Sequence, residues 1–384
     1  MTRRLYHDDA YARSFEAEVI AMTPAGAVLD RTAFYPEAGG QLGDHGTLGG
    51  VVVRDTQELD DGTIVHVVAD PLPLGPVHGE LDWARRRQHM AQHTAQHLLS
   101  GALLDRAAAP TASARLGESA LTIDVARDRI PEAELAAAET LANDIIDDDL
   151  AIRAWFPSAD ELASLKLRRD PKVAADIRVV AIGDFDLSPC GGTHCARTSQ
   201  LGAVRITSTE RYKGMTRVTF TAARRGRADL FARDHVLRGL ATQFSCGPAE
   251  VPSAIDKLRR DADAASAEVT ALRGRLAAIV ASSFAGTGAV VAALPGDAEL
   301  LRGVAAKLVA AGRDAILCAP DETGATAVLF RAPGSSLDCG ALWKKLQARL
   351  GGRGGGKPDR AEGRFATAPT DWAAMVAELS SQGW

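Results

Sequence analysis

The segments His93-Thr94-Ala95-Gln96-His97 and Cys190-Gly191-Gly192-Thr193-His194 each place two metal-binding side chains four residues apart. Side chains at i and i+4 lie one above the other on a helix, so the two histidines of the first segment share a face. The sequence from Arg85 to Leu104 is rich in Ala, Gln, Leu and Met and contains no proline, which predicts that helix. The second segment follows Pro189 and contains two glycines, which predicts a turn.

Together the two segments offer three imidazoles and one thiolate, a complete ligand set for one zinc ion. We therefore predict one zinc ion per chain, bound by His93, His97, Cys190 and His194. The number of ligands leaves its role open. Four protein ligands are typical of structural zinc, whereas catalytic zinc usually has three protein ligands and a water molecule.

Four segments of the chain resemble parts of alanyl-tRNA synthetase. The segment Thr32–Asp44 resembles the glycine-rich motif of its editing domains. The segments His93–His97 and Asp186–His194 are similar to the zinc motifs of the same domains. The segment Gly351–Arg360 resembles the signature of its C-terminal domain. The motifs occur in the family's order and span nearly the whole chain. The resemblance is to the long form of free-standing alanyl-tRNA editing proteins, since no room remains for an aminoacylation domain.

This resemblance implies a trans-editing hydrolase that deacylates tRNA(Ala) mischarged with serine or glycine. Thr32 would meet the serine hydroxyl, and Gln41 would hold a ribose or carbonyl oxygen; these are the predicted catalytic residues. Gly39 and Gly40 would let the backbone approach the substrate. Around Leu116 the chain lacks the histidine or glutamine that relatives often carry.

Composition fits a cytoplasmic protein. Of 384 residues 46% are hydrophobic, enough for several cores, and no apolar run reaches the roughly 20 residues that span a bilayer. The N-terminus has no apolar segment typical of a signal peptide. Five cysteines without a regular spacing indicate a reducing compartment. The net charge of −5 disfavours indiscriminate nucleic-acid binding, although the short basic clusters at residues 85–87, 166–169, 224–227 and 344–345 could contact tRNA phosphates.

We expect an α+β protein with four domains. Residues 1–84 alternate short β-prone segments with turns, which favours a small β-barrel. Residues 85–226 mix helices and strands and form the zinc-dependent editing domain. Residues 227–285 form a helical, coiled-coil linker, and residues 286–384 form a small α/β domain that binds tRNA. The strands expected in the barrel cover residues 15–20, 27–29, 50–53 and 63–68.

The linker carries apolar residues spaced by three and four, which is the pattern of a heptad seam. They are Ile255, Leu258, Ala262, Ala265, Val269, Leu272, Leu276 and Ile279. This seam packs either within a helical hairpin or against a second copy of the chain. The sequence therefore leaves open whether the chain forms a homodimer through the linker or the C-terminal domain.

The C-terminal domain contains a glycine run, Gly351–Gly356, which we expect to be a loop between two helices. Backbone N–H groups freed by glycine, with cations beside them, form an anion cradle. Through the resemblance, the anion would be tRNA phosphate and the cations Arg353, Lys357 and Arg360. Two alternatives to the editing hydrolase remain: a zinc hydrolase for another mischarged aminoacyl-tRNA, and a non-catalytic tRNA-binding module with structural zinc.

Overall fold

The computed structural model describes residues 2–171, 173 and 175–381. The chain divides into two compact units, Met1–Gly239 and Leu240–Trp384. The first unit contains the glycine-rich motif and both ligand segments. The second contains the expected α/β domain and most of the predicted heptad helix.

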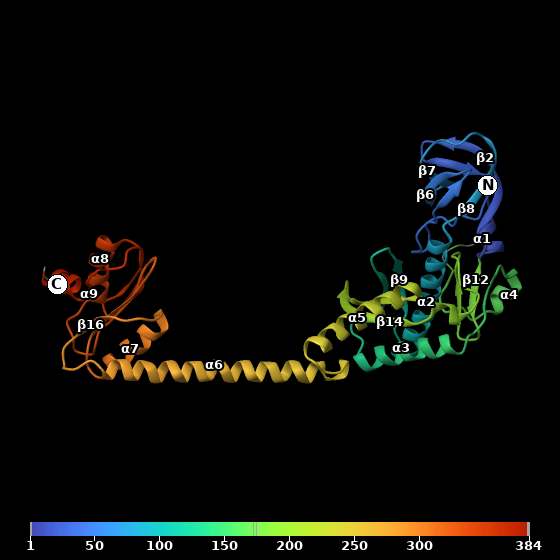
Figure 1. Ribbon diagram of the computed structural model, residues 1–384. Helices are drawn as coiled ribbons and strands as arrows, with labels where there is room; N and C mark the ends of the chain where they lie inside the picture. The colour runs from blue at the N-terminus through green and yellow to red at the C-terminus, as the bar shows by residue number, and fades with distance from the viewer. Residues whose placement is uncertain (1, 172, 174, 382–384) are drawn as a thin grey trace. The chain divides into compact units, whose positions relative to one another are not determined.

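The first unit begins with a closed six-stranded barrel, as the sequence predicts (Figure 1). Phe15, Ala17 and Val19 alternate with exposed residues along its first strand and fill the barrel core. Around the barrel the strands are β2 (Ser14–Thr23), β3 (Gly26–Leu29), β7 (Ile64–Val68), β6 (Val51–Glu58), β5 (Gly46–Leu48) and β8 (Gly75–Leu81). Beside it lie β1 (Arg3–Arg4), α1 (Leu5–Asp8) and β4 (Arg31–Thr32).

Helix α2 (Trp83–Ala107) follows the barrel and confirms the helix predicted from residues 85–104. Asp82 caps its first turn by accepting a hydrogen bond from the Arg85 backbone N–H at 3.1 Å. Every residue from His89 to Leu103 is buried, so the helix runs through the core rather than over it. It thereby places both histidines in the interior.

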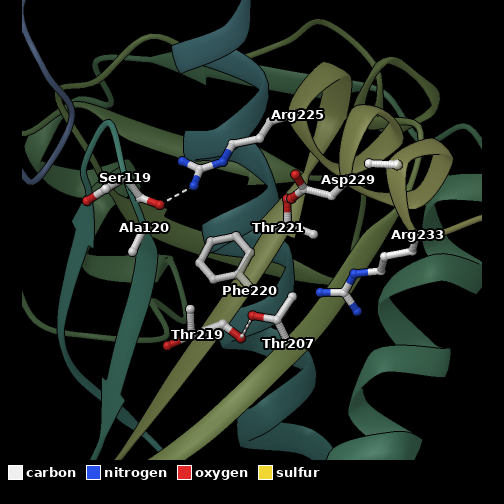
Figure 2. Close-up of a pocket in the computed structure, with 10 residues that line it drawn as sticks. Ser119, Ala120, Thr207, Thr219, Phe220, Thr221, Arg225, Asp229 and Arg233 are labelled. Carbon is white, nitrogen blue, oxygen red and sulfur yellow. Dashed lines mark hydrogen bonds between the residues drawn. The ribbon is translucent and has the colours of Figure 1, made fainter. Parts of the chain in front are cut away.

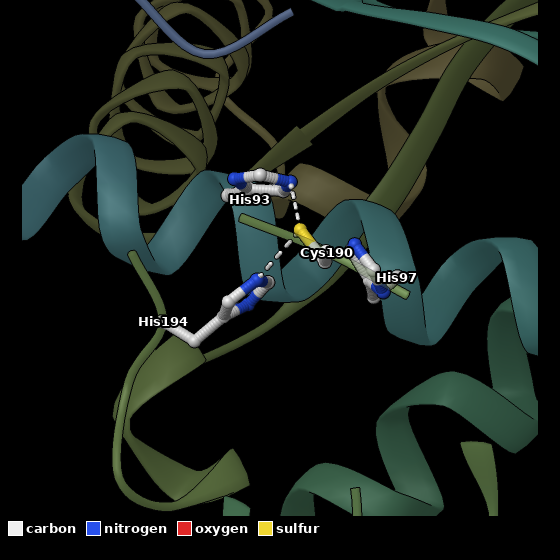
Figure 3. A group of neighbouring side chains, drawn as sticks. All are labelled: His93, His97, Cys190 and His194. Carbon is white, nitrogen blue, oxygen red and sulfur yellow. Dashed lines mark hydrogen bonds between the residues drawn. The ribbon is translucent and has the colours of Figure 1, made fainter. Parts of the chain in front are cut away.

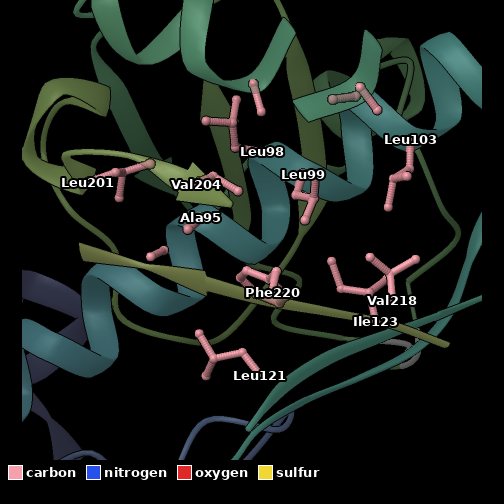
Figure 4. Packing of buried hydrophobic residues seen from close by; sticks show 14 of the residues in the cluster. Ala95, Leu98, Leu99, Leu103, Leu121, Ile123, Leu201, Val204, Val218 and Phe220 are labelled. Atoms are coloured by element: carbon pink, nitrogen blue, oxygen red, sulfur yellow. The ribbon is translucent and has the colours of Figure 1, made fainter. Parts of the chain in front are cut away.

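An antiparallel sheet and helix α3 (Glu132–Asp147) pack around α2 (Figure 4). In order the strands are β14 (Val204–Tyr212), β15 (Met215–Ala222), β10 (Leu121–Val125) and β9 (Thr111–Leu116). The core between them is aliphatic and aromatic, and includes Leu98, Leu99, Leu103, Ile123, Val218 and Phe220. Burying these side chains supplies the main stabilisation of this part of the unit.

A second, smaller sheet delivers the cysteine segment to α2. It contains β11 (Ile152–Trp155), β12 (Val179–Ile182) and β13 (Asp186–Pro189). Val179 pairs with Pro189 at the end of the β12–β13 ladder, so Cys190 leaves the sheet beside Arg178. The predicted turn therefore begins where pairing stops. The remaining elements of the first unit are α4 (Ala159–Ser164), the 3₁₀ helix η1 (Thr198–Leu201) and α5 (Ala223–Gln243), whose last residues enter the second unit.

The second unit is a mixed sheet covered by helices on both faces (Figure 1). Its strand order is β16 (Val290–Ala293), β17 (Ala315–Asp321), β18 (Gly324–Phe330), β20 (Arg360–Phe365) and β19 (Arg353–Lys357). One face packs against α6 (Val251–Ser282) and α7 (Ala298–Ala310), and the other against α8 (Cys339–Leu350) and α9 (Trp372–Ser381). The 3₁₀ helix η2 (Pro248–Glu250) precedes α6.

The expected glycine loop is wrong: Arg353–Lys357 is strand β19, paired antiparallel with β20. Its glycines are needed for close packing. A Cβ on Gly354 would lie 2.4 Å from the Trp343 ring, and one on Gly356 would lie 2.0 Å from the Arg360 carbonyl oxygen. Glycine here reflects the approach of α8 and β20 to the strand rather than a free loop.

The predicted helical pattern is confirmed in α6, but its apolar seam is exposed. Among the six larger seam residues, exposure ranges from 39% at Ile255 to 66% at Ile279. The helix packs on α7 with a neighbouring face that includes Ala277 and Ala281. The fold of the second unit by itself therefore leaves the seam in contact with solvent.

Candidate metal centre

The structure brings the four predicted ligands together (Figure 3). One potential ligand atom from each of His93, His97, Cys190 and His194 lies within 4.8 Å of the others. Cys190 Sγ is 3.4 Å from His93 Nε2 and 3.3 Å from His194 Nε2. Zn–N bonds of about 2.0 Å and Zn–S bonds of about 2.3 Å imply tetrahedral edges of roughly 3.3–3.7 Å. The spacing and the donor set therefore fit one zinc ion.

Each histidine turns its Nδ1 toward a protein group rather than toward the centre. His93 Nδ1 is 2.7 Å from Gln41 Oε1, and His194 Nδ1 is 3.2 Å from Thr94 Oγ1. The Thr94 hydroxyl donates to the Met90 carbonyl, so it accepts from His194. A proton on Nδ1 leaves the lone pair of Nε2 free to bind a metal ion.

The third histidine faces a buried ion pair. His97 Nδ1 lies 3.6 Å from Asp186 Oδ2, and Arg168 Nε donates to Asp186 Oδ1 at 2.5 Å. Ser188 also donates to this carboxylate. Sequence reasoning missed Asp186 and Arg168, although both belong to segments it examined. A carboxylate beside a ligand histidine orients the ring and raises its basicity.

The centre favours the thiolate form of Cys190. Burial alone would raise the pKa of this thiol, but the surrounding imidazoles lower it well below its ordinary value. Burial lowers the pKa of His194 to about 3. Burial also opposes protonation of His97, but Cys190 and Asp186 together raise its pKa. A thiolate is the form in which cysteine binds a metal, whereas His97 would have to give up the proton that its raised pKa favours.

Gln41 lies in the wall of the centre and its amide is fully used. Its Oε1 accepts from His93 and from the Thr193 backbone N–H, and its Nε2 donates to Thr193 Oγ1 at 2.8 Å. The residue is 0% exposed. A Cβ on Gly192 would lie 2.2 Å from the His93 ring, so only glycine fits there. The barrel motif thus reaches both ligand segments.

Thr32 is placed elsewhere, in β4 beside the barrel, where its side chain contacts His66 of barrel strand β7. It is 0% exposed and its hydroxyl donates to His66 Nε2 at 2.8 Å, because His66 Nδ1 donates to the Ala27 carbonyl. The Phe34 backbone N–H donates to the same hydroxyl. Among the described residues, Thr32 forms no hydrogen bond with the four ligands.

The two glycines of the motif have different surroundings. Gly40 packs on β9, since a Cβ there would lie 2.6 Å from the Ala114 carbonyl oxygen. Gly39 has a φ of +59° and no heavy atom within 4 Å of where its Cβ would be. Gly39 is therefore open to an approaching molecule, whereas Gly40 serves the contact between barrel and sheet.

A buried ion pair joins the barrel motif to the ligand helix. Arg86 Nε donates to Asp44 Oδ2 at 2.8 Å, and the two side chains are 0% and 1% exposed. Asp44 also accepts from the Tyr35 backbone N–H. Arg86 belongs to a cluster that composition alone suggested for tRNA phosphates. Its guanidinium instead fixes the glycine-rich motif against α2.

The cations predicted to bind phosphate lie in the second unit. Arg353 and Lys357 are exposed at the two ends of β19. Arg360 begins β20, where it pairs with Glu362 at 3.0 Å and covers the Phe330 ring. A cavity of about 360 Å³ in the first unit, between β15 and α5, shares no residue with the metal ligands (Figure 2).

Two comparisons with known proteins place the chain in its class. Residues 177–219 match the threonyl and alanyl tRNA synthetase second additional domain, and this stretch contains Cys190 and His194. The chain is 31% identical to alanine–tRNA ligase of Halorubrum lacusprofundi, over 94% of the chain and 42% of that protein. It is 32% identical to the Thermococcus kodakarensis ligase and 33% identical to the Halobacterium salinarum ligase, each with 42% of the relative covered.

The chain is therefore similar to part of the alanine–tRNA ligases, and residues 177–219 are similar to the second additional domain of threonyl and alanyl tRNA synthetases. It spans less than half the length of the curated relatives that it matches. None of the helices that the structure describes is both long and apolar enough to cross a membrane.

Proposed function

We propose that the chain hydrolyses the ester bond of tRNA(Ala) mischarged with serine, and of the same tRNA mischarged with glycine. The observation that carries the proposal is the cluster of three histidines and one cysteine, two of whose members lie inside the matched domain. A pocket for alanine rejects similarly small amino acids only about 10–200-fold, so accuracy needs a second site that removes the wrong product. The relatives' names, alanine–tRNA ligases, support tRNA(Ala) as the partner.

Zinc bound at this centre would polarise the ester carbonyl or lower the pKa of a bound water to about 7. The residues around it keep the ligands in place: Gln41 holds His93, Thr94 holds His194, and Asp186 faces His97. Cys190 is the one ligand of the four that is not fully buried. We place the approach of water and substrate on its side of the centre.

The preference for serine is the finer part of the proposal. If Thr32 provides this preference, the Thr32 hydroxyl must exchange its hydrogen bond with His66 for a hydrogen bond with the serine hydroxyl of the substrate. The open backbone at Gly39 would admit the aminoacyl group beside the barrel. Alanine, which has no hydroxyl, would leave Thr32 in its present bond.

Two alternatives have support in the same centre. A closed set of four protein ligands is typical of structural zinc, which favours a tRNA-binding module without catalysis. The match is also to a domain that threonyl-tRNA synthetases share, which favours a mischarged threonyl-type substrate.

Deacylation of Ser-tRNA(Ala), Gly-tRNA(Ala) and Ser-tRNA(Thr) by the metal-loaded chain separates these functions. We expect hydrolysis of the two alanine-specific tRNAs, loss of activity with a chelator, and recovery on adding zinc. His97→Ala should bind less metal and be inactive, because the ligand set is then incomplete. Full activity after verified metal loss would contradict the mechanism. Binding of tRNA without hydrolysis would favour structural zinc.

A further inference from the structure

The segment between β13 and the last ligand has an unusual set of backbone contacts. Four successive carbonyls, from Pro189 to Gly192, each accept a hydrogen bond from a side chain. Arg169 Nη2 donates to the Pro189 carbonyl, and His7 Nε2 donates to the Gly191 carbonyl at 3.0 Å. Each carbonyl oxygen of the segment therefore has a side-chain donor.

Arg178 makes two of the four contacts. Its Nη1 donates to the Cys190 carbonyl at 3.1 Å and to the Gly192 carbonyl at 2.8 Å. The Arg178 carbonyl in turn accepts from the Cys190 backbone N–H at 2.9 Å. One residue therefore holds the backbone of Cys190 on both sides, directly after the β12–β13 ladder ends.

The guanidinium occupies a costly position for a cation. Arg178 is only 7% exposed, and among the described residues it forms no ion pair with a carboxylate. Burial lowers its pKa, and the negative charge of Cys190 opposes that shift. A buried charge needs a partner of opposite sign or a full set of acceptors. Here the two loop carbonyls accept from Nη1 and so offset part of the cost of burial.

The opposite side of the segment is equally confined. Gly192 presses against the His93 ring, where a Cβ would come within 2.2 Å of Cε1. The peptide around Gly192 is thus held between the imidazole of one ligand and the guanidinium of Arg178. Neither contact can move without changing how Cys190 and His194 face α2.

We propose that Arg178 is a positioning residue of the metal centre, which holds the Cys190–His194 segment so that thiolate and imidazole converge with the two histidines of α2. This inference rests on the proposed metal site, to which Arg178 would contribute no ligand atom. Lysine is expected to be a poor replacement, because its ammonium lies one bond closer to Cα than Nη1, the single nitrogen that donates to both carbonyls.

Cobalt(II) binding to the full chain tests the inference, because visible absorption of the bound ion reports its coordination geometry. Affinity is measured by competition with a chromophoric chelator, and spectra are compared at saturation. Arg178→Met and Arg178→Lys should each weaken cobalt binding about 10–100-fold, the usual loss for a residue that supports a ligand. Their saturated spectra should differ from that of the native chain. A merely structural role would leave those spectra unchanged.

Arg169→Met is the matched control. It also removes one arginine that donates to this segment, but from an exposed position and before the first ligand. It should keep native affinity and spectrum. If both Arg178 variants also keep the native cobalt affinity and spectrum, the inference is overturned. Unfolding of both variants in excess zinc would also overturn it, since Arg178 would then support the whole fold. If the native chain itself binds neither zinc nor cobalt, the proposed metal site fails first.

Discussion

Gln41 has the geometry of a residue that supports a ligand rather than one that touches substrate. Both ends of its amide are engaged, with His93 at 2.7 Å and Thr193 at 2.8 Å, and it is fully buried. The motif that carries it thereby couples the barrel to the ligand helix. This coupling explains why a glycine-rich segment of the barrel belongs to the same functional unit as the metal ligands.

Gln41→Leu should therefore weaken zinc binding about 10–100-fold, because His93 loses the acceptor that fixes its tautomer. Zinc affinity is measured by chelator competition, and deacylation is followed at saturating zinc. Gln57→Leu is the control: this glutamine lies on a barrel strand and contacts Glu37 and Asp55 instead. If Gln41→Leu binds zinc normally but loses deacylation, a direct contact with substrate is the better assignment.

His66 should make stability depend on pH. It is buried in the barrel, and burial lowers its pKa to about 4, below the ordinary value of about 6.5. Protonation then favours the unfolded chain, so this contribution is present above pH 6.5 and is lost as pH falls toward 4. Between about pH 7.5 and pH 5 the loss is about 2 kcal/mol of unfolding free energy.

The measurement is denaturant unfolding of the native chain and of His66→Asn at both pH values. Asparagine can still donate to the Ala27 carbonyl and accept from Thr32 but does not titrate in this range. The variant should lose less stability on acidification than the native chain. His235→Asn, on exposed helix α5, serves as the control. Equal pH dependence in native chain and His66→Asn would contradict the assignment.

At the scale of elements, the sequence predicts those helices and strands that are determined by residues close together in the chain. Helix α2 follows from its composition and lack of proline, and the predicted barrel strands follow from short β-prone segments separated by turns. Strand β19 does not, because a run such as Gly354–Gly356 has the composition of a loop. What makes it a strand is the Trp343 ring and the β20 backbone, which only the tertiary structure supplies.

The exposed seam of α6 belongs to this scale, and we propose that it pairs two copies of the chain. In an antiparallel pair, the small Ala262 and Ala265 lie opposite the larger Leu272 and Val269 of the other copy, so the seam fills evenly. Asp261 then meets Arg275. Complementary sizes and charges of this kind specify coiled-coil pairing. A parallel pair would set alanine against alanine and leave gaps.

Sedimentation of the full chain should then show a dimer. The double substitution Leu258→Glu and Leu272→Glu should make it a monomer, because charges replace apolar seam residues that are 56% and 49% exposed in one chain. Ala264→Glu and Ala267→Glu add the same charge on the other side of the helix and should leave the dimer intact. A monomeric native chain would contradict the pairing.

At the scale of the whole molecule, the ligands could be predicted from sequence but their support could not. His93 and His97 are recognisable by spacing within one helix, as are Cys190 and His194 within one turn. Gln41 and Arg178 contact the ligand segments from other parts of the chain, and Asp186 lies four residues before Cys190 but faces His97 of the other segment. Only the packing of barrel, helix and small sheet brings these groups together.

The second unit should supply affinity for tRNA rather than chemistry. Its exposed strand β19 presents Arg353 and Lys357 on an edge of glycines, where a phosphate backbone can approach closely. Arg360 is already engaged with Glu362 and Phe330 and is the weaker candidate. Arg353→Glu with Lys357→Glu should therefore weaken tRNA(Ala) binding and flatten its salt dependence, by about 0.7–0.9 in slope for each lost phosphate contact.

Affinity is measured over a range of salt concentrations, and deacylation at saturating tRNA should stay near the native rate because the metal centre is untouched. Lys307→Glu with Lys344→Glu is the control, since it makes the same charge change on exposed helix positions of the same unit. If the control lowers affinity and slope equally, general charge rather than β19 attracts the tRNA. If neither variant changes them, the second unit does not contact phosphates. Dimerisation through the α6 seam would then be the one proposed role that remains for the second unit.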